Sequence, residues 1–151
     1  MSSLVYVSRP TIAFGDRADE LDDILAVSAA RNSALDITGL LIATPDYFAQ
    51  LLEGPSASID EVMASIMADN RHHDVRVVRR SDDHLRRYPA WRMARFEREN
   101  FGTFRTGPLL AACHLGEDRD ALAKLERLVD AIALGRVSVR PRPGTGPGPT
   151  P

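Results

Sequence analysis

Apolar residues along the first hundred positions follow two alternating patterns. Short runs rich in β-branched and aromatic residues predict strands, and longer stretches with apolar residues at helical spacing predict helices. The first helix is expected to begin at Asp16. The second is expected at Ser58, because Glu61 follows it at capping-box spacing. The predicted strands cover residues 4–8, 37–43, 47–53, 75–78 and 91–96.

The order of these elements is strand, helix, strand, strand, helix, strand, with one more strand at the end. This order predicts an α+β fold: a ferredoxin-like βαββαβ sheet with an extra strand and with both helices on one sheet face. A further helix is expected over about 118–134, with an apolar side formed by Leu122, Leu125, Val129 and Ile132. This additional C-terminal helix would cover the sheet or mediate contacts between copies of the chain.

Composition divides the chain into three predicted parts. Residues 1–97 hold the sheet domain, and residues 98–135 form a helical extension whose first half, interrupted by Gly107 and Pro108, carries no clear pattern. Residues 136–151 are rich in Pro and Gly and have too little apolar surface to offset the entropy of ordering, so a disordered tail is expected.

Charge and cysteine content narrow the functional classes. The chain has 19 basic and 21 acidic residues, a formal charge of −2, so neither nucleic acid nor a membrane is an expected partner. A single cysteine, Cys113, forms no intramolecular disulfide, and the N-terminus lacks the pattern of a signal peptide. A cytoplasmic protein is expected.

Familiar catalytic motifs are absent from the sequence. It has no phosphate-binding glycine loop, nucleophile elbow or helical His-Glu zinc pair, so we do not expect an enzyme. The adjacent His72 and His73 have no third ligand at useful spacing, and no metal is expected. The charged residues from Asp82 to Arg87 predict a solvated loop.

Two polar residues inside apolar strands carry more information. Tyr6 lies in the first predicted strand and Gln50 in the third, and these strands are neighbours in a ferredoxin-like sheet. A buried amide left without partners costs about 1–3 kcal/mol. Gln50 therefore needs either a cofactor, or Tyr6 and nearby backbone groups, to complete its hydrogen bonds.

Other positions are ordinary when each is taken alone. Asn32 is expected at the end of the first helix, where asparagine tolerates a left-handed backbone. Ile24 and Ile66 belong to the apolar stripes of the two helices, and Trp91 and Met93 are typical of strand core.

Several separated blocks nevertheless occur in one characteristic order over residues 4–96. Taken together they resemble the BLUF family, the sensors of blue light using FAD. No single block is specific, whereas the joint order is. The blocks are Leu-Val-Tyr-Val-Ser-Arg from Leu4, Arg-Asn-Ser-Ala-Leu-Asp-Ile-Thr-Gly-Leu-Leu from Arg31, Phe-Ala-Gln-Leu-Leu-Glu-Gly from Phe48, Asp-Asn-Arg-His from Asp69, and Arg-Arg-Tyr-Pro-Ala-Trp-Arg-Met from Arg86.

The resemblance implies a flavin inserted between the first two helices. FAD is expected, with FMN or riboflavin as alternatives. Ile24 and Ile66 would pack on the faces of the ring, and Asn32 and Gln50 would hydrogen-bond its pyrimidine-like edge, with Gln50 bridging to Tyr6.

At the phosphate side of the flavin, the resemblance implies a second group of contacts. Arg71 and His72 match positions that line this side in relatives, and positive donors suit a diphosphate. Asp69 belongs to the same block.

The resemblance also implies a mechanism and an output. Under blue light Tyr6 would donate an electron and a proton, and a rearranged Gln50 amide would remain as the switched state. The last strand, with Trp91 and Met93, would relay the change through self-association, as a homo-oligomer, or to a separate output protein. Two alternatives stay open: a ferredoxin-like flavin-dependent redox enzyme, and a ligand-free interaction module in which Tyr6, Asn32 and Gln50 form only a core network.

Overall fold

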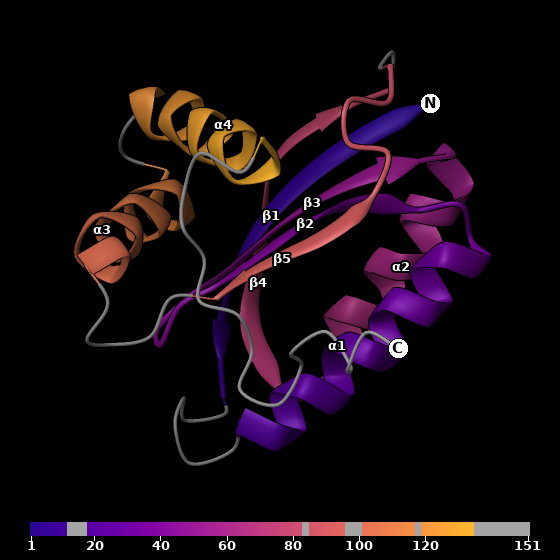
Figure 1. The fold of residues 1–151 in the computed structure, drawn as a ribbon, viewed down its shortest axis with the longest axis horizontal. Coiled ribbons are helices and arrows are strands. Elements are labelled where there is room, and N and C mark those ends of the chain that lie inside the picture. Colours follow the sequence, from indigo (N-terminus) through magenta and orange to yellow (C-terminus); the bar gives the residue numbers. More distant parts are fainter. Residues whose placement is uncertain (12–17, 83–84, 96–100, 117–118, 135–151) are drawn as a thin grey trace, which may run out of the picture.

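A single mixed sheet with helices on both faces forms the molecule (Figure 1). The computed structural model describes residues 1–11, 18–82, 85–95, 101–116 and 119–134. Its strands are β1 (Ser2–Pro10), β2 (Thr38–Ala43), β3 (Phe48–Gly54), β4 (His72–Ser81) and β5 (Trp91–Arg95), and its helices are α1 (Ala18–Ala34), α2 (Ser56–Ala68), α3 (Phe101–Leu115) and α4 (Arg119–Ala133).

The strand order is that of a ferredoxin-like sheet with one strand added. It runs β4-β1-β3-β2-β5; the first four strands pair antiparallel, and β5 pairs parallel to β2. This confirms the predicted α+β fold and the neighbouring positions of the first and third strands. Figure 1 shows α1 and α2 on one face of the sheet and α3 and α4 on the other.

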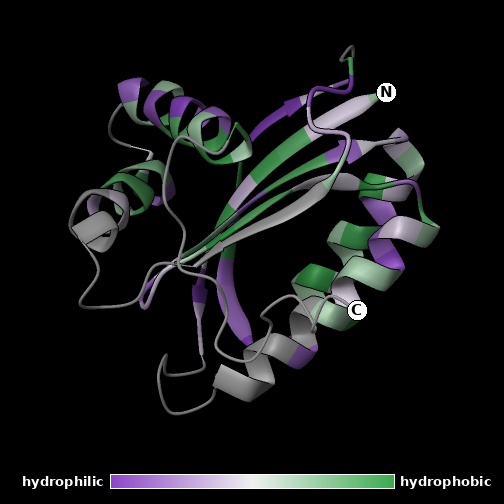
Figure 2. Cartoon of the chain, in the orientation of Figure 1, coloured by the Kyte–Doolittle hydropathy of each residue, from purple (hydrophilic) through white to green (hydrophobic). Residues whose placement is uncertain are grey.

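Alternation along β1 and β3 supplies a core on each face, because successive side chains of a strand point to opposite sides. Leu4 and Tyr6 pack with the buried stripe of α2, whereas Val5 and Val7 pack with α3 and α4. We call these the α1–α2 face and the α3–α4 face. Figure 2 shows the hydrophobic positions concentrated in the central strands, with β4 more hydrophilic.

The start of α2 differs from the predicted capping box. The helix begins at Ser56, and its N-cap is Pro55, whose side chain makes no capping hydrogen bond. Proline suits this position because its fixed φ fits a helix start and its missing N–H would have no partner there. Ser58 and Glu61 therefore lie inside the helix, although the predicted stripe is buried as expected: Ile59, Val62, Met63 and Ile66.

The region after β5 contains two helices where the sequence predicted one. α3 was missed because Gly107 and Pro108 lie inside it and disguise its pattern, yet Leu110 is fully buried against the sheet. α4 is close to its predicted bounds and buries Leu125, Val129 and Ile132. Ala121 takes the first core position in place of Leu122.

The sequence predicted the bounds of the edge strand β4 less well than those of the other edge strand, β5. β4 extends well beyond the predicted 75–78, because the arginines and histidines of this edge strand interrupt its apolar run. Asp16, Phe96 and the predicted tail over 136–151 lie outside the described residues. Within the part that the structure describes, no helix is long and apolar enough to cross a membrane.

Candidate functional site

Tyr6 and Gln50 meet on the α1–α2 face. They stand opposite each other in the β1–β3 register, and both are buried. The Tyr6 hydroxyl donates a hydrogen bond to Oε1 of Gln50. The structure therefore brings together the two polar residues that the sequence placed in neighbouring strands.

Burial determines the protonation of Tyr6. Loss of solvent raises the pKa of its hydroxyl well above the usual range, and the negative charge of Asp69 raises that pKa further. The positive charge of Arg31 acts in the opposite direction. Tyr6 is thus a neutral donor whose proton is held toward Gln50.

Asn32 is the most unusual residue of this region. Its side chain is 1 % exposed, and neither its Oδ1 nor its Nδ2 has a hydrogen-bond partner among the described residues. It lies inside α1, and the left-handed residue after the helix is Asp36, so the predicted role of Asn32 as a left-handed helix terminus is wrong. A buried amide without partners indicates room for a polar ligand.

Apolar residues of α2 line the same face. Ile66 and Met63 are buried in one cluster with Tyr6, and Ile37, which follows α1, belongs to it as well. The side chain of Ile24, the corresponding prediction on α1, lies outside the described residues.

Asp69, Arg71 and His72 gather where α2 ends and β4 begins. The Arg71 guanidinium binds both carboxylate oxygens of Asp69, with 2.9 Å from Nη2 to Oδ2, and these hydrogen bonds lower the pKa of the Asp69 carboxyl. Half of the Arg71 side chain is exposed, so the guanidinium lies at the rim of the region.

His72 ties three elements together beside Tyr6. Its Nδ1 lies 2.8 Å from the Ser8 hydroxyl of β1, and its Nε2 lies 2.8 Å from the Ile66 carbonyl of α2. Its ring centroid is 6.3 Å from that of Tyr6. His72 is therefore committed to holding β4 against α2.

Met93 lies in the same cross-strand row as the polar pair. Its Cα is in register with Leu41 of β2, which is in register with Gln50, which is in register with Tyr6. The Cα of Trp91 is in register with Gly39, two residues before Leu41 on β2. The side chains of both β5 residues lie outside the described residues.

Sequence reasoning missed three neighbours of this region. Ser8 follows Tyr6 at strand spacing and is fully buried, so the period of two could have found it. Met63 was predicted only as core. Arg31, whose charge acts on Tyr6, carried no sequence signal beyond its place beside Asn32. Among the residues that the structure places, no three His, Cys, Asp or Glu side chains gather as a metal site.

Comparison with known proteins agrees with this geometry. The family model described as "Sensors of blue-light using FAD", BLUF, matches residues 1–94. The solved dark-state structure of BlrB, a BLUF protein, superposes with a TM-score of 0.67 at 30% identity, covering 89% of this chain and 96% of that one.

Two curated relatives are much longer proteins. The photoactivated adenylate cyclase subunit beta of Euglena longa is 34% identical over 105 residues, which are 69% of this chain and 12% of the relative. The blue light- and temperature-regulated antirepressor BluF of Escherichia coli (strain K12) is 28% identical over 75 residues, which are 50% of this chain and 18% of the relative. The chain thus spans less than a fifth of the length of either relative.

Proposed function

This chain belongs to the BLUF family of blue-light flavin photoreceptors, and we propose that it binds FAD on the α1–α2 face and uses Tyr6 and Gln50 as its photoactive pair. The observation that carries the proposal is the buried amide of Asn32, which has no hydrogen-bond partner among the described residues. An amide offers one acceptor and two donors, which complement the alternating carbonyl and N–H groups of a flavin's pyrimidine-like edge.

The remaining predicted contacts fit the same ligand. Ile66, with Ile24 as its proposed counterpart on α1, would supply apolar surface to the ring. Arg71, His72 and Asp69 lie at the end of α2. The half-exposed Arg71 guanidinium would supply the positive donor that suits a diphosphate, and His72, bound to Ser8 and Ile66, would hold the adjoining backbone in place. Because Arg71 already binds Asp69, the diphosphate would share its guanidinium. FAD should therefore bind more tightly than riboflavin; FMN is the intermediate alternative.

The photochemistry needs little from the protein beyond the polar pair. A bound flavin would absorb blue light, and the excited flavin would be a strong electron acceptor. Tyr6 is the proposed donor of the electron and proton, since its neutral hydroxyl already points its hydrogen at Gln50. The Gln50 amide has an acceptor end and a donor end, so rotating or tautomerising it reverses the bonding pattern around it.

Blue illumination of the purified chain tests this function. The protein should be yellow, and light should produce a small, reversible red shift of the flavin spectrum without bleaching. Gln50→Leu should keep the flavin and lose the shift, because leucine has no amide to rearrange. Tyr6→Phe should lose it too, whereas Tyr47→Phe, on the α3–α4 face, should keep it. A normal shift in Gln50→Leu contradicts the proposed switch.

A flavin redox enzyme is the other function class, and no comparison favours it. A redox enzyme would be identified by bleaching of the flavin when NAD(P)H is added in the dark. For a sensor, we propose output through self-association or a separate protein, with Trp91 and Met93 as relay residues. Direct binding to nucleic acid or to a membrane is not proposed, and the cytoplasmic location stays a prediction.

The proposed division of the chain follows the sequence. Residues 1–97 are the photosensory domain, 98–135 the helical extension and 136–151 a tail. Ala121, Leu125, Val129 and Ile132 of α4 lie buried against the chain's own sheet. Any contact between copies would therefore use another surface of the extension.

A further inference from the structure

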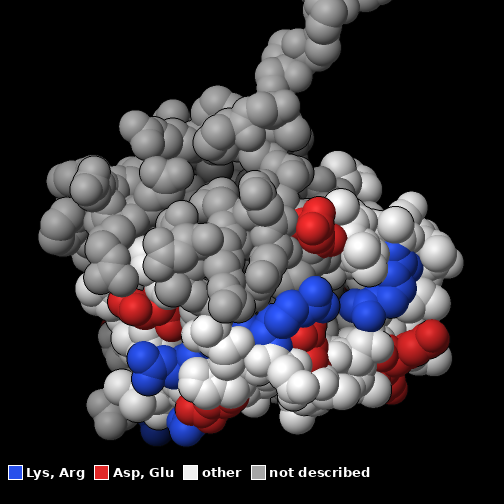
Figure 3. Space-filling view, turned by 90° about the horizontal axis from the view of Figure 1, so that it is seen from below, with Lys and Arg blue, Asp and Glu red and all other residues white. Residues whose placement is uncertain are grey.

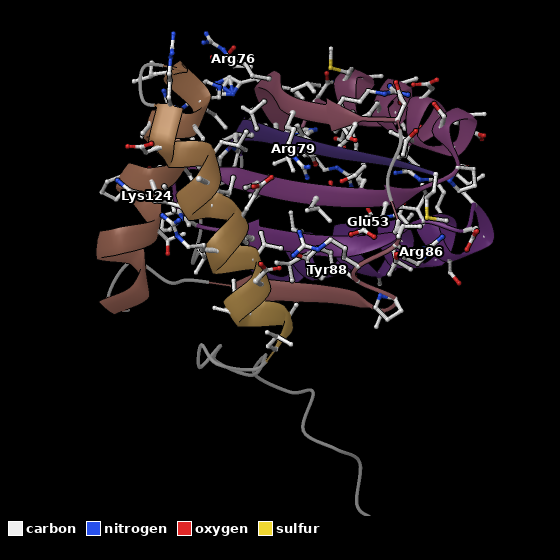
Figure 4. All side chains as sticks on the ribbon, turned by 90° about the horizontal axis from the view of Figure 1, so that it is seen from above. Glu53, Arg76, Arg79, Arg86, Tyr88 and Lys124 are labelled. Atoms are coloured by element: carbon white, nitrogen blue, oxygen red, sulfur yellow. The ribbon has the colours of Figure 1, made fainter. Side chains whose placement is uncertain are left out.

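The segment over 85–90 leads into β5 and is anchored by a buried carboxylate. Glu53 on β3 is fully buried on the α3–α4 face, and its Oε2 accepts hydrogen bonds from the backbone N–H groups of Arg87 at 2.6 Å and Tyr88 at 3.4 Å. A charged acceptor makes such bonds stronger than neutral ones. Figure 4 looks onto this face and shows Glu53, Arg86 and Tyr88 close together.

The same segment binds α4 through one acidic residue. The Tyr88 hydroxyl donates to Oδ1 of Asp130, and Nη2 of Arg87 lies 3.2 Å from that oxygen and 3.3 Å from Oδ2. The Arg87 guanidinium also lies over the Tyr88 ring, 5.5 Å from its centroid. Two consecutive residues of the segment therefore hold a single carboxylate of the helix.

Apolar packing joins the segment to α4 in part, because the Tyr88 ring packs against the cluster that includes Val129 and Ile132. Beside it, a pocket of about 540 Å³ that is partly open to solvent is lined in part by Gly39, Pro89, Asp130 and Leu134. The contacts of Asp130 add directional polar attachment between the segment and this end of α4.

The polar pair reaches this segment by two short routes. Across the sheet, Gln50, Leu41 and Met93 are in register, and Met93 follows the segment on β5. Along β3, Gln50 lies three residues before Glu53. The first route ends on β5, the strand that follows the segment, and the second ends at Glu53, which binds the backbone of Arg87 and Tyr88.

We propose that Glu53 and Tyr88 are positioning residues that couple β5 to α4, with Glu53 holding the segment over 85–90 to the sheet and Tyr88 holding it to Asp130. A change at Gln50 that shifts β5 then moves α4 through this contact. The proposal rests on the proposed photosensory function for its input, while the coupling itself exists in the dark.

A second attachment of α4 provides the matched control. Glu126 lies one turn before Asp130 and pairs with Arg79 of β4, with 3.0 Å between Nε and Oε1. This contact joins the same helix to the far edge of the sheet and bypasses β5. Glu126→Gln removes comparable charge from α4 without touching the segment.

Hydrogen exchange of the full chain in the dark tests the coupling alone. Tyr88→Phe removes one hydroxyl and should speed exchange about tenfold both in residues 85–95 and in the second half of α4. Glu126→Gln should leave residues 85–95 unchanged. Asp130→Asn and Glu53→Gln are second variants should Tyr88→Phe fold poorly. Faster exchange in α4 alone, or in the segment alone, overturns the coupling.

Illumination then tests the direction of the signal. Wild type should show a light-dependent change of exchange in α4, and Gln50→Leu should lose both this change and the flavin red shift. Tyr88→Phe should keep the red shift and lose most of the change in α4, while Glu126→Gln keeps both. A full α4 response in Tyr88→Phe overturns the proposal. Absence of a red shift in wild type would instead contradict the proposed function, and the dark measurement would still decide the coupling.

Discussion

At the residue scale, the polar side chains of the α1–α2 face have different consequences for folding and for ligand binding. Gln50 has Tyr6 as a partner inside the protein, but Asn32 has none among the described residues. An unpaired buried amide destabilises the ligand-free fold by about 1–3 kcal/mol. Retaining such a residue makes physical sense if a bound ligand completes its hydrogen bonds.

Replacing Asn32 with leucine should therefore change the stability of the flavin-free protein and its affinity for flavin in opposite directions. Leucine has a similar volume and no polar atoms, so the flavin-free protein should be as stable as wild type or more stable, by up to about 2 kcal/mol in urea unfolding. Flavin affinity should fall by about tenfold or more. Ser33→Ala, at the exposed neighbouring position, is the control and should change neither. A variant that unfolds more easily but binds flavin normally would refute this role of Asn32.

Tyr6 should make stability depend on alkaline pH. Its pKa is raised in the folded chain, whereas the unfolded value is about 10, so the folded state holds the proton more tightly. Its stabilising contribution is complete below about pH 10 and is lost as the pH rises toward the folded pKa. Wild type should lose about 1.4 kcal/mol per pH unit more than Tyr6→Phe in this window, measured by urea unfolding of the flavin-free proteins. Equal slopes would show that Tyr6 ionises freely when folded.

At the element scale, β2 depends on a glycine where it approaches β3. Gly39 has φ 151°, and an added Cβ would lie 1.9 Å from the Leu51 carbonyl oxygen. Gly39 is also the register partner of Trp91, so displacement there disturbs the attachment of β5. Gly107 in α3 has the opposite surroundings, because nothing lies within 4 Å of an added Cβ.

The same substitution at these two glycines should shift stability in opposite directions. Gly39→Ala should destabilise by about 2 kcal/mol or more, because backbone atoms of β3 must move. Gly107→Ala should stabilise by up to about 1 kcal/mol, because alanine favours helix and meets no obstacle. Urea unfolding measures both. If both substitutions changed the free energy of unfolding in the same direction, β2 or α3 would have to relax away from this geometry.

At the scale of the whole molecule, the two cores share their strands. Successive residues of β1 face α2 and then the α3–α4 layer, as Leu4 and Val5 do. Because both cores use the same strands, loss of a strand disrupts both of them. This favours a single cooperative unfolding transition for a chain of this size.

Unfolding should therefore look the same by two independent probes. Fluorescence of the single tryptophan reports on β5, and far-UV circular dichroism reports on all helices and strands. Their urea transitions should coincide in midpoint and slope. An early loss of helical signal would show that α3 and α4 separate from the sheet as an independent unit.

The chain has a formal charge of only −2. Figure 3 shows basic and acidic side chains interspersed on one face. Several described ion pairs, such as Arg80–Asp60 and Arg71–Asp69, are substantially exposed, where such pairs contribute little to stability. This pattern supports recognition of a flavin and a local protein surface by specific contacts rather than by overall charge.

Most of the fold could be predicted from the sequence because local patterns encode it. Strand runs, helical stripes and element order were enough for the ferredoxin-like sheet and for the placement of Tyr6 beside Gln50. α3 could not be predicted, since Gly107 and Pro108 contradict helix propensity and its stability comes from packing Leu110 against the sheet. The start of α2 was also predicted wrongly, because its N-cap is Pro55, whose ring offers no capping group, instead of a residue of the capping box.

The sequence by itself thus determined the sheet, the polar pair and, through resemblance, the flavin, because strand period and motif order are properties of the linear chain. Only the tertiary structure decided that Asn32 is buried with no partner in the described part of the chain, and that Glu53 and Asp130 hold the segment before β5. The charged residues before β5 predicted nothing more than a solvated loop. These hydrogen bonds join residues 34 or more positions apart, so they depend on where the chain folds back, and no local sequence pattern encodes such a contact.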